Sequence, residues 1–384
     1  MPTDASNRVS TRRNFVAAAA STAAVMASAA RPGGTVHARA PEDEGQRILP
    51  PGNVEHVIFI WLGGGMSQID TFDPKRRGDS GDRRPGSDYD AIDTSVPNVQ
   101  VCEHLPELAR RMERVTAVRS CNHDMIDEHA AAVYWVHVGR PINGTIAYPS
   151  IGSAISHELG AVSEGAPAYS VIGYPNMARS PGFLGAKHGY LYLTDLETGP
   201  RGLMRPEYVD TTRVGRRLQM LEAVRKASHH KVGSSHFLKQ YSAAQYENLR
   251  LSGEEFMPVF DLGRETDTTR NRYGGEFGQR CLLARRMTEY GVRFVEVAHN
   301  LNFVNGTGWD THREGQQNQW RLVRELDTAV SALMDDLEDR KRLDKTLIVI
   351  GTEFGRPAGF DAAGGRGHQS TAFTLVLAGG GLNH

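Results

Sequence analysis

The segment Thr346-Leu-Ile-Val-Ile-Gly-Thr352 constrains the fold of this chain more than any other part of the sequence. It is apolar without alternation and is bounded by charged residues and glycines, which is typical of a strand buried on both faces. Three polar residues follow it, Glu353, Arg356 and, one loop later, His368. We therefore expect a central strand whose carboxyl end carries functional side chains.

Other segments predict further strands and helices around this one. Apolar runs predict strands over residues 54–62, 115–119, 292–298 and 373–377. Helical periodicity covers residues 105–114, 127–138 and 315–342, and the last of these has a continuous apolar stripe. Strands that alternate with helices over long crossovers imply an α/β fold with a doubly wound, mainly parallel sheet and helices on both faces.

A helical region interrupts this alternation. Residues 213–252 read as two helices and residues 273–290 as a third, so we expect a helical insertion or flanking layer over about 213–290. The chain stops at His384, shortly after a predicted strand. Because a doubly wound sheet rarely ends there, we expect a truncation at the carboxyl terminus.

Charge and cysteine content narrow the function. The 44 Lys and Arg residues balance 45 Asp and Glu residues, and a net charge of -1 predicts neither nucleic-acid nor anionic-membrane binding. The three cysteines lack zinc-type spacing and allow at most one disulfide.

The amino terminus is typical of an export signal. Arg12-Arg13-Asn-Phe15 precedes a mild, alanine-rich apolar run, residues 17–30, which is the pattern of a twin-arginine signal peptide over 1–30. The run is too short and weak for a stable membrane span. A linker over 31–52 and one domain over 53–384 would follow. We expect the twin-arginine machinery as a partner and a periplasmic or secreted location.

Asp310 and His312 form the best candidate metal ligands. On an extended segment, residues two apart face the same side, so both side chains can reach one divalent ion. Such oxygen and nitrogen donors suit zinc, manganese, iron or calcium. Alternatively, Asp310 caps the following helix and His312 is a surface residue.

The residues after the central strand allow two interpretations. Glu353 is either a metal ligand or an ion-pair partner of Arg356, whose planar fork also fits an anion. His368 lies in a glycine-rich loop and is a candidate ligand or acid/base, or simply an exposed residue.

Two earlier segments carry further candidates. Asp70, Asp73 and Lys75 follow Gly63-Gly-Gly65 and could be ligands and a cation, although Asp73-Pro74 also begins turns. His129 lies with one other histidine, His123, and three acids at a predicted helix start, where acids also favour the helix dipole.

The motifs Gly63-Gly-Gly-Met-Ser-Gln-Ile-Asp-Thr-Phe-Asp-Pro-Lys75, Trp309-Asp-Thr-His312, Glu353-Phe-Gly-Arg356 and Gly367-His368 carry a family resemblance. From about residue 54 onward the chain resembles domain-of-unknown-function family 1501, exported bacterial proteins related to sulfatases and alkaline phosphatases. The resemblance implies an alkaline phosphatase-like fold and divalent metal at the carboxyl ends of strands.

Departures from the wider superfamily are part of the same resemblance. Gly63-Gly64 stands where sulfatases have an aspartate pair, so Asp70 or Asp73 would have to substitute. Glu353-Phe354 stands where Asp-His is common, and His129 stands at the position of the nucleophile.

Two hypotheses follow. In the first, the chain is an exported, metal-dependent hydrolase of an anionic small-molecule or glycan ester. Arg356 and Lys75 would stabilise anionic charge and His129 would be the acid/base; metal ligands would come from Asp310, His312, Glu353, His368, Asp70 and Asp73. In the second, it is a catalytically degenerate binding or scaffolding protein of the cell envelope.

Overall fold

The structure is a computed structural model. It describes residues 53–125, 128–174, 176–194, 196, 199–200, 203, 208–232, 251, 256–299, 308–312, 315–361 and 364–382, which lie within the compact unit Gly52–His384. Among these residues no helix is both long and apolar enough to cross a membrane.

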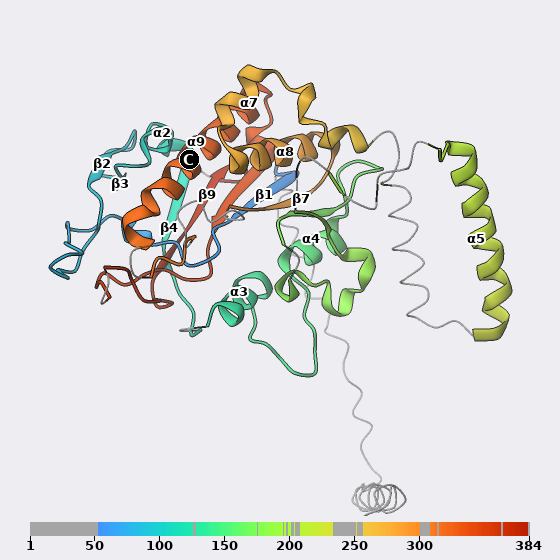
Figure 1. The fold of residues 1–384 in the computed structure, drawn as a ribbon, viewed down its shortest axis with the longest axis horizontal. Helices are drawn as coiled ribbons and strands as arrows, with labels where there is room; N and C mark the ends of the chain where they lie inside the picture. Colours follow the sequence, from blue (N-terminus) through green and yellow to red (C-terminus); the bar gives the residue numbers. More distant parts are fainter. Residues whose placement is uncertain are drawn as a thin grey trace, which may run out of the picture. The chain divides into compact units, whose positions relative to one another are not determined.

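A seven-stranded sheet in the order β4-β9-β8-β1-β7-β5-β6 forms the centre of the described part (Figure 1). The strands are β1 (His56–Trp61), β4 (Val115–Cys121), β5 (Tyr169–Ile172), β6 (Leu191–Leu193), β7 (Phe294–Ala298), β8 (Thr346–Gly351) and β9 (Phe373–Gly379). Six strands of this sheet run in the same direction, and β9 runs opposite to them, so it pairs antiparallel with both β8 and β4. The prediction of a mainly parallel sheet is confirmed.

Strand β1 lies between β8 and β7 and organises both faces of the sheet. Its side chains alternate: Ile58 and Ile60 face one apolar cluster, while Phe59 and Trp61 face the other. Trp61 is level with Gly351 of β8 and with Ala298 of β7. The carboxyl ends of three neighbouring strands therefore meet at one edge.

Helices cover both faces of the sheet. One face packs on α8 (Glu276–Tyr290) and α9 (Gly315–Asp339), and the other on α3 (His129–Val138) and α4 (Ile151–Leu159) (Figure 1). The predicted apolar stripe of α9 is confirmed, because its members are buried against the sheet: Leu322, Val323, Leu326, Val330, Leu333, Met334 and Leu337. Gly139 ends α3 in the left-handed conformation, at φ 71°, as the sequence predicts.

Several elements differ from the prediction. The helix predicted over residues 105–114 is two shorter pieces, α2 (Pro106–Ala109) and a 3₁₀ turn, Met112–Arg114. The helix predicted over residues 273–290 begins only at Glu276, because Gly274, at φ 79°, breaks it from α7 (Asp267–Tyr273).

The predicted helical region over about 213–290 does not form a single insertion. Its last helix, α8, contributes buried residues to the same cluster as β1 and α9, so this part is a flanking layer of the sheet. Helix α5 (Thr211–Val232) is present, whereas the second predicted helix lies mostly outside the described residues. The remaining named elements are a small hairpin, β2 (Ala91–Asp93) with β3 (Gln100–Cys102), and short 3₁₀ turns.

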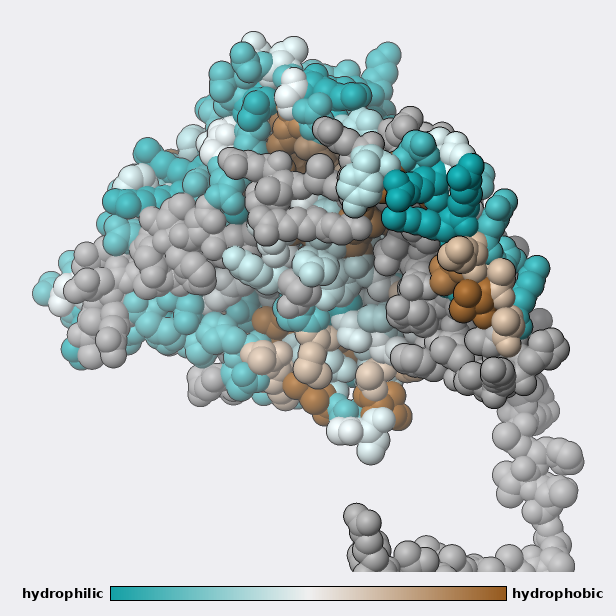
Figure 2. All heavy atoms as spheres, turned by 45° about the vertical axis from the view of Figure 1, so that its right-hand side comes forward, coloured by the Kyte–Doolittle hydropathy of each residue, from teal (hydrophilic) through white to brown (hydrophobic). Residues whose placement is uncertain are grey.

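The outer surface is mixed in polarity. Figure 2 shows hydrophobic side chains in small patches between hydrophilic ones. Exposed apolar residues include Ile142, Ile146, Met177 and Phe183, all from the segments around α3 and α4.

Candidate metal centre

Four segments converge at the edge where β1, β7 and β8 end. They are the glycine turn after β1, the segment 308–312 before α9, the residues after β8, and the first turn of α3. Glu128 begins α3 by accepting the backbone N–H groups of Ala130 and Ala131, which places His129 at the first helical position. The fold thus presents side chains from both halves of the chain at one place.

Imidazole and carboxylate groups form a cluster at this edge. Oδ1 of Asp310 lies 3.5 Å from Nε2 of His129, 3.2 Å from Nε2 of His312 and 3.6 Å from Nε2 of His368. The two Nε2 atoms of His312 and His368 are 3.0 Å apart. His129, Asp310 and His368 each offer a ligand atom, and these atoms all lie within 4.8 Å of one another.

Glu353 lies behind His129. Its Oε1 accepts a hydrogen bond from Nδ1 of His129 at 2.8 Å and from the backbone N–H of Gly64 at 2.7 Å. The side chain is only 1% exposed, whereas His129 is 35% exposed. This carboxylate fixes the imidazole so that Nε2 points at Asp310. It is the arrangement in which a carboxylate orients a metal-binding histidine.

Arg356 braces the loops that surround the cluster. Its fully buried guanidinium donates to Asp310 at 2.5 Å and to the backbone carbonyls of Gly65 and Arg366 at 3.0 and 2.9 Å. Further carbonyl contacts go to Gly64 and Gly367. The fork is therefore occupied by the protein itself, which favours a positioning function for Arg356.

Nε2 of His129 and Oδ1 of Asp310 face each other across 3.5 Å. Because Glu353 holds the proton on Nδ1, a neutral His129 turns an unprotonated Nε2 towards Asp310, and this atom has no hydrogen-bond partner among the described residues. A proton or a metal ion between these two atoms would satisfy both of them.

The pKa values of His129 and Asp310 are shifted in opposite directions by their closeness. The neighbouring carboxylate of Asp310, and then that of Glu353, raises the pKa of His129 to about 9. Burial alone would raise the pKa of Asp310, but His129, His368 and Arg356 hold it well below its usual range. A charged Asp310 is thus present at all ordinary pH values.

The donor set fits a divalent transition metal. Zinc and iron take such ligands, here the imidazole nitrogens of His129 and His368 and a carboxylate oxygen of Asp310, whereas calcium and magnesium prefer oxygen alone. The imidazole of His312 lies beside them, with its Nε2 3.4 Å from the guanidinium of Arg356. Asp310 and His312 are about two-fifths exposed, so the cluster is accessible to a ligand from solvent.

Three predicted site residues lie outside this cluster. Asp70 is fully buried and forms an ion pair with Arg366 at 2.8 Å, and its Oδ1 accepts the N–H of Asp88. Asp73 pairs with Lys75 at 2.7 Å. The structure therefore brings together His129, Asp310, His312, Glu353, Arg356 and His368, but not Asp70, Asp73 or Lys75.

Sequence reasoning did not include two residues that contact the cluster. Oδ2 of Asp361 lies 3.6 Å from Nδ1 of His312, and the N–H of Gly64 binds Glu353. Asp361 follows Arg356 by five residues, in a loop without a recognisable motif. Gly64 is part of the quoted glycine motif, and its contact with Glu353 depends on the parallel pairing of β1 and β8.

Residues 54–384 match the model of a family described as "Protein of unknown function (DUF1501)". The chain belongs to this family. No curated protein matches the chain at a significant level.

Solved structures show only distant similarity to this DUF1501 protein. The lipoteichoic acid synthase LtaP from Listeria monocytogenes has a TM-score of 0.39 and 8% identity, over 86% of this chain and 66% of that one. Ps i-CgsB in complex with k-i-k-neocarrahexaose has a TM-score of 0.38 and 12% identity, over 85% and 66%. The alkaline phosphatase from the Antarctic bacterium TAB5 has a TM-score of 0.36 and 10% identity, over 86% and 92%. The chain thus spans just under two thirds of the length of the first two.

Proposed function

We propose that this DUF1501 chain is an exported, metal-dependent hydrolase of an anionic ester. The observation that carries the proposal is the convergence of His129, Asp310, His312 and His368, with Glu353 orienting the first of them. These four residues would hold the metal. The sequence-based hypothesis had Glu353 as a metal ligand and His129 as the acid/base. In the present proposal His129 would bind the metal and Glu353 would orient His129.

A divalent ion held there would polarise an ester oxygen and lower the pKa of a water molecule. Neighbouring side chains of the protein hold the proposed metal ligands in position. Asp310 is held by the guanidinium of Arg356, and His129 is held by Glu353, so both enter the site with few alternative orientations. No serine, threonine or cysteine is among the described residues that form the cluster, which favours attack by water over a covalent intermediate.

Metal analysis of the purified full chain is the direct test. We expect about one equivalent of zinc or iron, and loss of most of it in His129→Ala and His312→Ala. Aryl sulfates, phosphomonoesters and phosphodiesters should then be screened with the metal-loaded protein. A chain that binds no divalent ion, and whose activity is indifferent to His312→Ala, would refute the proposal.

A second candidate is a binding or scaffolding protein of the cell envelope with the same fold. The enclosure of Arg356 favours it, because a fully buried guanidinium is not free to bind a substrate anion. Metal binding without turnover on any ester class, with or without added zinc, iron or manganese, would support this candidate over the hydrolase.

Export is part of the proposal and rests on Arg12-Arg13 and the apolar run over residues 17–30. Replacing both arginines by lysine in a fusion of residues 1–52 to a folded reporter should abolish twin-arginine export. Unchanged export of the double-lysine fusion would contradict this part.

A further inference from the structure

The loop that follows α3 and the segment that leads into β6 form one continuous surface. The backbone N–H of Phe183 donates to the carbonyl of Ala147 at 3.0 Å, and the N–H of Ser150 donates to the carbonyl of Ser180 at 2.9 Å. We call this surface the apolar loop surface. Its members are the described residues of 139–151 and 174–192.

The apolar loop surface holds most of the large apolar side chains that the described residues expose. Seven of the eleven belong to it, and they are Ile142, Ile146, Ile151, Tyr174, Met177, Phe183 and Tyr192. Figure 1 shows the loop after α3 projecting below α3 and α4, and Figure 2 shows hydrophobic side chains along the lower edge of the described part. Exposed apolar side chains that gather in this way mark a binding surface, whereas single ones need no explanation.

This surface carries positive charge and no negative charge. Its described residues include no aspartate or glutamate, and Arg140 and Lys187 are exposed cations. The Cζ atom of Arg140 lies 5.2 Å from the centre of the Tyr148 ring, whereas Arg179 is buried and pairs with Glu296. The net charge of -1, from which we expected no anionic-membrane binding, does not report such a local asymmetry.

The tip of the projecting loop binds part of its own polar groups. Oδ1 of Asn143 accepts the backbone N–H of Thr145 at 2.9 Å and the hydroxyl of the same residue at 2.8 Å. Ile142 and Ile146 flank this turn, and Pro141 has no N–H to satisfy. These features lower the cost of taking the tip out of water.

From these observations we propose that the apolar loop surface binds an anionic lipid bilayer. Such a bilayer presents negatively charged headgroups above an apolar interior. Ile142, Met177 and Phe183 would enter the boundary between headgroups and acyl chains, and the exposed tyrosines suit the same depth. Arg140 and Lys187 would contact lipid phosphates.

A protein partner fits this surface less well. In a symmetric dimer the same surface faces itself, so the cations of one copy would meet those of the other with no acid between them. Other protein partners commonly add a strand to a sheet or lay a helix in a groove. The projecting loop over residues 139–147 contains no helix or strand, whereas a fluid bilayer can adapt to projecting side chains.

Helix α3 connects this surface to the metal centre. His129 lies at the start of the helix and Gly139 directly after its end, ten residues later, which corresponds to about 15 Å along the axis. None of the proposed metal ligands belongs to the loop surface. The inference therefore goes beyond the proposed function and can be tested without turnover.

Co-flotation of the full chain with lipid vesicles tests the inference. One set of vesicles contains equal parts of phosphatidylglycerol and phosphatidylcholine, and the other contains phosphatidylcholine alone. We expect tighter binding to the anionic vesicles, with an affinity that falls as salt rises. The apolar run over residues 17–30 is common to all variants, so differences between variants report on the loops.

One pair of variants tests the apolar side chains. Ile142 and Met177 are 58% and 80% exposed, so Ile142→Ser/Met177→Ser should fold normally and bind both sets of vesicles about tenfold or more weakly. Met220→Ser/Val224→Ser on α5 is the matched control, because these residues are 71% and 60% exposed, and it should bind as the wild type does. Circular dichroism and thermal unfolding establish that each variant folds.

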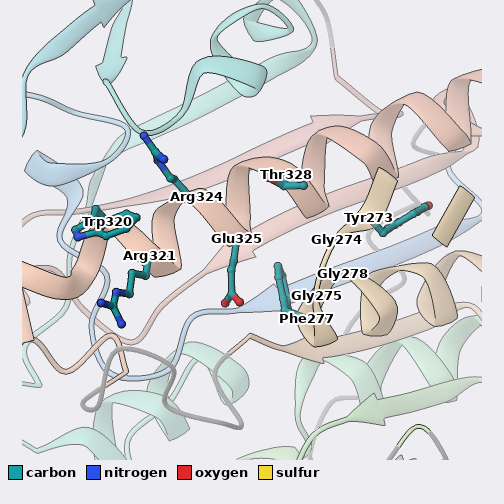
Figure 3. Close-up of a pocket in the computed structure, with 10 residues that line it drawn as sticks. All are labelled: Tyr273, Gly274, Gly275, Phe277, Gly278, Trp320, Arg321, Arg324, Glu325 and Thr328. Carbon is teal, nitrogen blue, oxygen red and sulfur yellow. The ribbon is translucent and has the colours of Figure 1, made fainter. Parts of the chain in front are cut away.

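A second pair of variants tests the charge. Arg140→Gln/Lys187→Gln should weaken binding to the anionic vesicles by about ten- to thirtyfold and leave binding to phosphatidylcholine unchanged. Arg321→Gln/Arg324→Gln removes the same charge from exposed positions of α9, on the opposite face of the sheet, where both residues line a groove of about 400 Å³ (Figure 3). This control should bind the anionic vesicles as the wild type does.

Four results would overturn the inference. The first is no binding of the wild type to either set of vesicles, and the second is an equal loss in a variant and its matched control. The third is a loss in the charge variant without one in the apolar variant, which would indicate an acidic protein as the partner. The fourth is a dimer in sedimentation velocity that Ile142→Ser/Met177→Ser abolishes, which would assign the surface to a second copy.

Discussion

Glu353→Gln is the change that best tests the metal centre. It exchanges one oxygen for an NH₂ group at a side chain that is 1% exposed, so the shape of the site is retained. The variant keeps one oxygen for the two donors that now share Oε1, the N–H of Gly64 at 2.7 Å and Nδ1 of His129 at 2.8 Å, but it removes the negative charge that strengthens both hydrogen bonds.

The expected magnitude follows from the charge that is lost. A charge-assisted hydrogen bond to a buried carboxylate contributes about 1.5–3 kcal/mol. Loss of a carboxylate that orients a metal-binding histidine lowers metal affinity by about 10–100-fold, and about 1.4 kcal/mol corresponds to each factor of ten. The two estimates agree, so we expect a metal dissociation constant that rises by about one to two orders of magnitude.

Competition with a chromophoric chelator measures this dissociation constant directly. Glu338→Gln is the matched control, because it neutralises an exposed carboxylate on α9 and should leave the constant unchanged. Circular dichroism and thermal unfolding without metal establish that each variant folds. A folded Glu353→Gln protein that binds zinc as tightly as the wild type would refute the argument that Glu353 orients His129 for a metal.

Three other changes test the surroundings of the site. Gly64→Ala should weaken metal binding, because φ is 121° and the new Cβ would lie 2.5 Å from the backbone nitrogen of Asp310. The control is Gly139→Ala, at φ 71° with open space around it, which should lower the free energy of unfolding but leave metal binding unchanged. Urea unfolding and metal titration separate these outcomes. Glu296→Gln should lower the free energy of unfolding by about 3–5 kcal/mol, since it leaves the buried Arg179 without its charge partner; a loss below about 1 kcal/mol would contradict this. Burial opposes ionisation of Glu296, yet His137 and Arg179 lower its pKa from 4.5 to about 2, so this contribution is complete above about pH 4.5 and is lost as pH falls towards 2. Acid unfolding of the wild type should therefore be steeper between these values than that of Glu296→Gln.

The strongest sequence patterns predicted the centre of the fold. Strand β8 is a continuous apolar run and α9 has a stripe at helical spacing, so each signals its own structure and burial. Strand β5 has only four residues and β6 only three. A segment of that length has no resolvable period, and only pairing with a neighbour makes it a strand: β5 pairs with β7, and β6 pairs with β5.

The sequence predicted which strand ends would bring candidate residues together, but it did not predict how those residues are arranged within the site. Asp310, His312 and His368 were expected together because strand ends meet at one edge of a parallel sheet. Whether Glu353 or His129 faces the proposed metal ion depends on how α3 packs on the sheet. That packing is a tertiary property, which a local sequence pattern does not report. Asp70 and Asp73 carried the same carboxylate chemistry as Asp310. The buried pair of Asp70 with Arg366 depends on a contact across 296 residues, which no local pattern reports.

The use of buried charge is the best reason to prefer a metal centre over a surface that binds no metal. Replacing a buried ion pair by apolar residues is often neutral or stabilising, so stability alone does not explain why Arg356 and Glu353 are charged. Every contact of the Arg356 guanidinium described here goes to the segments that carry Asp310, His368 or the glycine turn. Glu353 likewise binds the glycine turn and His129. Both charges therefore fix the relative positions of the candidate ligands. A binding surface without a metal would have little need for that order, whereas a centre that must hold one ion in one geometry depends on it.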